Sequence, residues 1–116
     1  MPDLLSVTIA EADGAVSIAA HGEVDLFTVR TLEGAIAEVL TEDESATVVL
    51  DLTGVTFLAS VGLNVMVVAH RECAKRGRAL VVRASGAVRR AMRSAGSDTI
   101  VTVEDATDGT ARAPEA

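Results

Sequence analysis

The run that decides the fold is residues 48–63, which read Val-Val-Leu-Asp-Leu-Thr-Gly-Val-Thr-Phe-Leu-Ala-Ser-Val-Gly-Leu. Four of its first five residues are apolar, which is typical of a strand buried on both faces in a partly parallel sheet. Asp51, Thr53 and Gly54 then supply residue types that form turns. The sequence therefore predicts a short buried strand that ends at a turn.

A helix is predicted directly after this strand. The largely apolar run 61–69 is too long for a second strand, and it leads into cationic residues and then Gly77, as expected at the C-terminus of a helix. We predict that Ser60 is the N-cap of this helix. A serine at such a position exposes its hydroxyl beside unpaired backbone N–H groups and the positive end of the helix dipole, so it is well placed to carry an anion.

Before this run, the pattern predicts two strands and one helix. Residues 5–10 alternate between apolar and small or polar side chains, and Asp13-Gly14 marks a tight turn into a second strand at 15–20. A loop with two carboxylates, Glu23 and Asp25, comes next. The helix then has apolar residues at three- and four-residue spacing, namely Val29, Leu32, Ile36, Val39 and Leu40.

After the second helix, the pattern predicts a strand, a helix and a final strand. Residues 79–82 form an apolar run of the buried kind, and residues 99–103 form the short last strand. Ser85 is the expected N-cap of the helix between them, at 86–95. Gly96 stands where a left-handed C-terminal cap is expected.

These elements define the expected fold class. A chain of 116 residues fits one domain with one core. Strand-helix-strand connections imply parallel neighbours with right-handed crossovers, and the hairpin contributes an antiparallel pair. We therefore predict an α/β domain over residues 1–106, with a mixed, mostly parallel sheet, an N-terminal antiparallel hairpin and three main helices. The polar residues 107–116 are expected to form a disordered tail.

Composition narrows the possible partners. The net charge of −7 and the lack of Trp and Tyr disfavour binding to nucleic acids or anionic membranes. Eight of the ten Lys and Arg lie between Arg71 and Arg93, whereas eleven of the seventeen acids lie between Asp3 and Asp51, so a dipolar surface is expected. The single Cys73 is expected to be a buried thiol. With no signal sequence or membrane span in the sequence, a cytoplasmic location is expected.

Signatures of an enzyme are mostly missing, and we predict no catalytic residue, metal site or cofactor. His21 and His70 fall in different elements and are expected at ordinary surface or rim positions. Ser60-Val61-Gly62 is similar to the nucleophile elbow of serine hydrolases, but Leu58 stands where that motif needs glycine. A small serine hydrolase that uses Ser60 is therefore a remote alternative.

The chain resembles the STAS domain of bacterial anti-sigma factor antagonists over about residues 5–103. The resemblance rests on Phe57-Leu58-Ala59-Ser60-Val61-Gly62-Leu63, on Gly22-Glu23-Val24-Asp25 ahead of the first helix, and on residues 85–96. The order of the elements agrees throughout. The resemblance implies a STAS-like fold and a regulator that is not an enzyme.

In that family the antagonist binds an anti-sigma factor that is also a serine kinase of the GHKL type, and this binding frees the sigma factor. Phosphorylation of a serine at the start of the helix after the third strand breaks the complex, and a metal-dependent serine phosphatase resets it. Ser60 matches the phosphorylated serine. The expected partner-binding residues are Glu23, Asp25, Leu58, Ala59, Ser60, Val61, Gly62 and Leu63.

Two positions depart from the family pattern. The usual motif has an acid immediately before the phosphorylated serine and a serine or threonine after it, whereas this chain has Ala59 and Val61. Two interpretations therefore stay open: a switch through Ser60, or a STAS-like module that is not phosphorylated and binds its partner constitutively or senses a small ligand. For Glu23 and Asp25, solvated loop carboxylates are an equally good interpretation.

Overall fold

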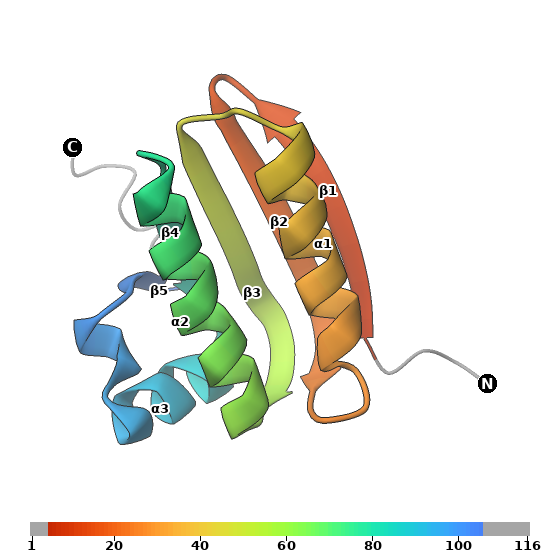
Figure 1. Cartoon of the computed structure of the whole chain (residues 1–116). Helices are drawn as coiled ribbons and strands as arrows, with labels where there is room; N and C mark the ends of the chain where they lie inside the picture. The colour runs from red at the N-terminus through yellow and green to blue at the C-terminus, as the bar shows by residue number, and fades with distance from the viewer. Residues whose placement is uncertain (1–4, 106–116) are drawn as a thin grey trace.

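The computed structural model describes residues 5–105, which form a five-stranded sheet with helices packed on it (Figure 1). The elements are β1 (Leu5–Ala12), β2 (Ala15–Val24), α1 (Val29–Glu42), β3 (Thr47–Leu58), α2 (Ser60–Lys75), β4 (Ala79–Ala84), α3 (Gly86–Ala95), the 3₁₀ helix η1 (Ser97–Thr99) and β5 (Thr102–Asp105). The predicted tail at 107–116 lies outside the described residues.

The strands follow chain order across the sheet, and only the β1–β2 pair is antiparallel. This confirms the predicted α/β class, the mixed sheet and its N-terminal hairpin. Right-handed crossovers between parallel strands in sequential order bring the helices to the same face of the sheet. In Figure 1, α1 and α2 lie side by side over the strands, and α3 packs mainly against β3.

The hairpin turn and the last helix follow the sequence closely. Asp13 and Gly14 form the two-residue turn with φ angles of 49° and 81°, and a type I′ turn requires positive values at both positions. The hydroxyl oxygen of Ser85 accepts a hydrogen bond from the backbone N–H of Val88 at 3.2 Å, and Gly96 ends α3 in the left-handed conformation. β5 begins at Thr102, later than predicted, because η1 ends at Thr99 and a turn at residues 100–101 follows it.

The core lies between the sheet and the helices. Every second residue along the middle strands is buried, as Ile18, Leu50 and Val82 illustrate, while the residues between them are partly exposed. The prediction that the third strand is buried on both faces is therefore wrong: Val49 is half-buried because the helices cover one face only. The Cys73 side chain is fully buried, as predicted, and this burial raises the pKa of its thiol.

β3 runs on through the predicted turn and ends at Leu58, so the prediction of a turn is wrong. Two register shifts interrupt its pairing with β2; at the first, Ala19 and His21 of β2 face Asp51 and Gly54 of β3, so β3 carries an extra residue. The carboxylate oxygen Oδ1 of Asp51 accepts from the backbone N–H of the second residue after it at 3.0 Å. Turn-forming residue types here shape a β-bulge inside a strand.

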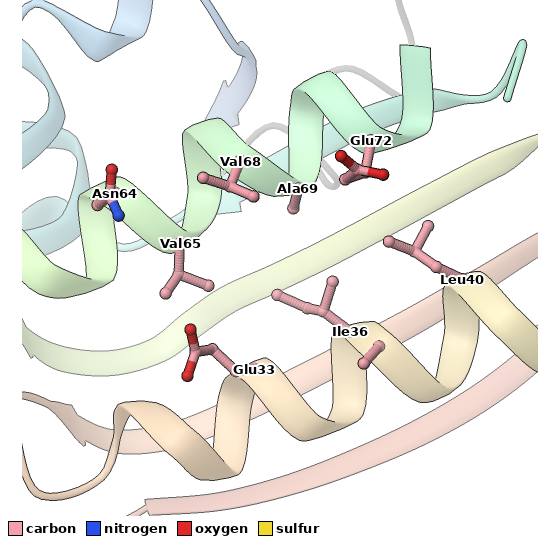
Figure 2. Close-up of a pocket in the computed structure, with 9 residues that line it drawn as sticks. Glu33, Ile36, Leu40, Asn64, Val65, Val68, Ala69 and Glu72 are labelled. Atoms are coloured by element: carbon pink, nitrogen blue, oxygen red, sulfur yellow. The ribbon is translucent and has the colours of Figure 1, made fainter. Parts of the chain in front are cut away.

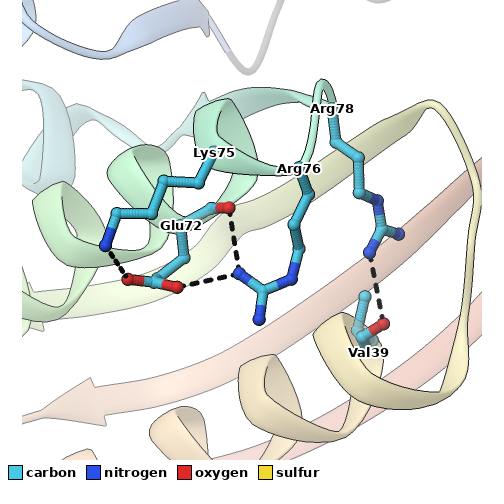
Figure 3. A network of polar contacts seen from close by, with 5 residues as sticks. All are labelled: Val39, Glu72, Lys75, Arg76 and Arg78. Carbon is cyan, nitrogen blue, oxygen red and sulfur yellow. Dashed lines mark hydrogen bonds and ion pairs between the residues drawn. The ribbon is translucent and has the colours of Figure 1, made fainter.

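Many cations of the second half of the chain are paired with acids. The ion pairs are Lys75–Glu72 (3.2 Å), Arg76–Glu72 (2.8 Å), Arg78–Asp43 (3.0 Å) and Arg83–Asp51 (3.8 Å). The Arg78 guanidinium also donates to the carbonyl of Ser45 at 2.7 Å, and it reaches the carbonyl of Val39 near the end of α1 (Figure 3). Local pairing therefore neutralises part of the expected charge separation. Within residues 5–105, no helix is long and apolar enough to cross a membrane.

Candidate partner-binding site

The candidate site lies at the edge of the sheet where β2 and β3 end and α2 begins (Figure 1). The parallel register pairs Glu23 with Phe57 and Val24 with Leu58. The backbone N–H of Ala59 then donates to the carbonyl of Val24 at 2.9 Å. The two strands are thus held together up to the residue before the helix, which fixes where α2 starts.

The prediction that Ser60 is the N-cap of this helix is wrong by one residue. Ala59 has the extended backbone of an N-cap, with φ −80° and ψ 167°, and Ser60 is the first helical residue. The carbonyl of Ala59 accepts from the backbone N–H of Gly62 at 2.9 Å and of Leu63 at 3.2 Å. Its bond to Val24 keeps Ala59 extended. The Ser60 side chain is exposed, and it makes no hydrogen bond to any residue of the described part of the chain.

Replacing Ser60 with alanine is therefore expected to change the free energy of unfolding by less than about 0.5 kcal/mol, because no cap bond is lost. Urea denaturation measures this change. Ser85→Ala is the matched control: it removes the cap bond to Val88 and a 2.7 Å bond to the carbonyl of Val55, and it should cost about 1 to 2 kcal/mol. Equal losses in the two variants would contradict the assignment of the cap to Ala59.

The predicted partner-binding residues differ in exposure. Glu23 and Ser60 are exposed; Asp25, Ala59, Val61 and Leu63 are half-buried; Leu58 and Gly62 are buried. A Cβ atom on Gly62 would lie 2.5 Å from Cδ1 of Leu58 and 2.8 Å from Cγ1 of Val24. Leu58 and Gly62 therefore set how closely α2 packs on the strands, while the other residues line the accessible edge.

Asp25 organises the loop between β2 and α1. Its carboxylate oxygen Oδ1 accepts from the backbone N–H of Phe27 at 2.9 Å and of Thr28 at 3.1 Å. The Thr28 hydroxyl accepts from the backbone N–H of Asp25 at 3.0 Å and donates to the carbonyl of Glu23 at 2.7 Å. We call Asp25 and Thr28 the polar clamp. The prediction that both carboxylates lie in a loop is wrong for Glu23, because β2 extends to Val24; Asp25 shapes the loop, and Glu23 is an exposed residue of the strand.

Three exposed apolar residues at this edge were not predicted as site residues. Leu26 is 72% exposed, Phe27 is 88% exposed, and Phe57 is 50% exposed. These two are the only Phe of a chain that has no Trp or Tyr, and a core position would be their usual place. The sequence signal that could have found them is the position of Leu26 and Phe27 in a loop between two turn-forming residues.

An apolar groove of about 280 Å³ lies between α1 and α2, farther along the helices (Figure 2). Its lining residues are Glu33, Ile36, Ala37, Leu40, Asn64, Val65, Val68, Ala69 and Glu72. Figure 2 shows that the polar residues are spread along the groove, with Glu72 far from Glu33. A small-molecule site usually has polar groups that converge on one point, so the groove does not favour ligand sensing.

Residues 6–109 match the family model described as the STAS domain. The chain therefore belongs to the STAS domain family, and the resemblance noted in the sequence is confirmed. It is 35% identical to the anti-sigma-F factor antagonist RsfB of Mycobacterium tuberculosis over 97 aligned residues. The aligned region covers 84% of this chain and 79% of RsfB. Within the family, the chain is an anti-sigma factor antagonist.

Solved structures agree with this placement. The crystal structure of an anti-sigma factor antagonist from Mycobacterium paratuberculosis superposes with a TM-score of 0.76 at 32% identity, over 89% of this chain and 87% of that chain. The antagonist SpoIIAA in its unphosphorylated form gives a TM-score of 0.74 at 18% identity, over 91% and 92% of the two chains. The likeness to SpoIIAA concerns the fold alone.

Anti-sigma factor antagonists are non-enzymatic regulators, so the hydrolase alternative is not needed. The structure offers it no support either. His70 is ten residues after Ser60 in the same helix, about 15 Å along its axis, which is too far for a general base. The His21 side chain packs against Gly54 of β3: a Cβ atom added to Gly54 would lie 2.6 Å from Nδ1 of His21.

Proposed function

We propose that this antagonist binds an anti-sigma factor that is also a serine kinase of the GHKL type, and that phosphorylation of Ser60 breaks the complex. The observation that carries the proposal is the place of Ser60, exposed at the first helical position of α2. Backbone N–H groups in the first turn of a helix lack helical acceptors, and the helix dipole favours an anion there. A phosphate on Ser60 is therefore compatible with the folded state.

The same phosphate would oppose binding. It adds a charge of about −1.5 to −2 to a surface where Val61 and Leu63 are half-buried and Glu23 is an exposed carboxylate. Closing an interface over Ser60 would desolvate the dianion, which is costly without a charged partner. We further propose that a metal-dependent serine phosphatase restores binding, and that the protein acts in the cytoplasm.

A second candidate function is a STAS module that is not phosphorylated and binds its anti-sigma factor constitutively. The observation that favours it is the pair of residues around Ser60. Ala59 and Val61 stand where the family pattern has an acid and a hydroxyl residue. A kinase that recognises its substrate through those two side chains would lack both contacts here.

One experiment separates the two functions. The GHKL-type anti-sigma factors encoded in the same genome are purified, and their binding to the protein is measured by calorimetry before and after addition of ATP and magnesium. The switch predicts binding without ATP, then phosphate on Ser60 located by mass spectrometry, and release of the partner. Ser60→Ala should bind without release, and Ser94→Ala, which alters an exposed serine of α3, should behave as the wild type. Binding with no phosphate on Ser60 would favour the constitutive module.

A further inference from the structure

We infer that Leu26, Phe27 and Phe57, called here the apolar patch, are the main affinity-determining contact with the anti-sigma factor. The inference rests on the proposed function. Single apolar residues on a surface are ordinary, but apolar residues that gather at one functional edge mark an interaction site. Leu26 and Phe27 come shortly after β2 and Phe57 lies next to the last residue of β3, so three of the most exposed large apolar side chains in the described part of the chain lie where these two paired strands end. Phe is also enriched in the cores of protein interfaces, where a few buried side chains carry most of the binding energy.

The polar clamp holds the apolar patch outward. The loop between β2 and α1 is closed by hydrogen bonds from Asp25 and Thr28 to the backbone on both sides of Leu26 and Phe27. These bonds fix the backbone in a form that keeps the two apolar side chains in solvent. Because the loop is already ordered before the partner arrives, binding costs little conformational entropy.

Glu23 on β2 adds a negative charge beside Phe57 of the apolar patch. The register pairs Glu23 with Phe57, so the two side chains share one face of the sheet. Glu23 is exposed and forms no ion pair with any residue between 5 and 105. The partner surface that fits is therefore an apolar pocket flanked by a cationic group, which is a common pairing at protein interfaces.

The apolar patch also explains how an anti-sigma factor could recognise this chain without the acid and the hydroxyl residue that usually flank the phosphorylated serine. Ala59 and Val61 offer no charge and no hydroxyl beside Ser60. The apolar patch reaches the same edge from the loop ahead of α1 and from the end of β3. An anti-sigma factor can then be held close to Ser60 by contacts that do not involve the residues next to it.

Calorimetry with the purified GHKL-type anti-sigma factor that binds the wild type tests the inference. Phe27→Ser and Phe57→Ser should each raise the dissociation constant about 30-fold or more. Ile100→Ser is the matched control, because Ile100 is 49% exposed but precedes β5, the outermost strand on the side of the sheet away from β2, and it should change the dissociation constant less than about 3-fold. Thermal melts check folding, and Phe27→Ser should melt like the wild type because its side chain packs on little.

Asp25 supplies a further test of how the patch works. Asp25→Ala removes the acceptor of the polar clamp and should weaken binding about 10-fold or more. Asp25→Asn keeps an oxygen acceptor at the same place and should recover most of that loss, although its charge is gone. A loss in Asp25→Asn equal to that in Asp25→Ala would overturn the positioning role and assign Asp25 to direct contact with a cation.

The outcomes distinguish failure of the inference from failure of the proposed function. If the wild type binds and both Phe variants bind equally well, the apolar patch is not the contact and the inference is overturned while the proposed function stands. An equal loss in Ile100→Ser would overturn it too, because the effect would not be local. If no GHKL-type anti-sigma factor of the same genome binds the wild type, the proposed function and the inference fail together.

Discussion

Ser60→Asp is expected to weaken binding of the anti-sigma factor about 100-fold or more while leaving the fold intact. Aspartate places an unpaired negative charge in the proposed interface, and desolvating such a charge on binding typically costs several kcal/mol. At the first helical position of α2, the same charge is favourable to the helix dipole. Calorimetry gives the affinity, and a thermal melt shows that the fold persists.

Ser60→Asn is the matched control for this charge. Asparagine has nearly the same size as aspartate, so a large loss in the Asp variant and a small loss in the Asn variant would assign the effect to charge. Similar losses in both would assign it to size. Wild-type affinity in Ser60→Asp would remove the physical basis of the proposed switch.

Leu52→Ala is expected to lower the free energy of unfolding by about 2 to 5 kcal/mol. Leu52 is fully buried on β3, which is the central strand of the sheet and the one that carries Ser60 at its end. Domains of this kind have a total stability of about 5 to 15 kcal/mol, so the variant should lose a large part of it. Urea denaturation followed by circular dichroism measures the change.

Val49→Ala is the control on the same strand. Val49 is half-buried on the face that the helices leave uncovered, so this variant should lose about 1 kcal/mol or less. Losses of equal size would show that the two faces of β3 are equally packed, which would contradict the one-sided core.

The periodicity of apolar residues, together with turn and capping residues, was enough to predict the order of the elements and the mixed sheet. Residues 29–40 repeat at helical spacing and residues 5–10 alternate, and the structure places α1 and β1 there. Asp13-Gly14 and Gly96 were predictable because each needs a positive φ that few other residues adopt easily. Both the periodicity and the positive-φ positions depend on neighbouring residues in the sequence, so they can be predicted from the sequence alone.

What the sequence could not supply depends on contacts between distant segments. Asp51 and Thr53 have the chemistry of a turn, but pairing with β2 keeps β3 extended and converts the turn into a bulge. Ser60 is a better capping residue than Ala59, yet the bond from Ala59 to Val24 decides where the helix begins. The exposure of Phe27 likewise follows from hydrogen bonds of its neighbours, which composition does not reveal.

A loop whose shape depends on positions 25 and 28 leaves positions 26 and 27 free to change without loss of the fold. If the apolar patch contacts the anti-sigma factor as inferred, exchanging these two residues is expected to change partner choice without loss of the fold. The side chains at positions 26 and 27 are therefore expected to be exchangeable while the loop keeps its conformation. Exchanging Leu26 and Phe27 together with the matching pocket of the partner is a direct route to insulated pairs for synthetic circuits.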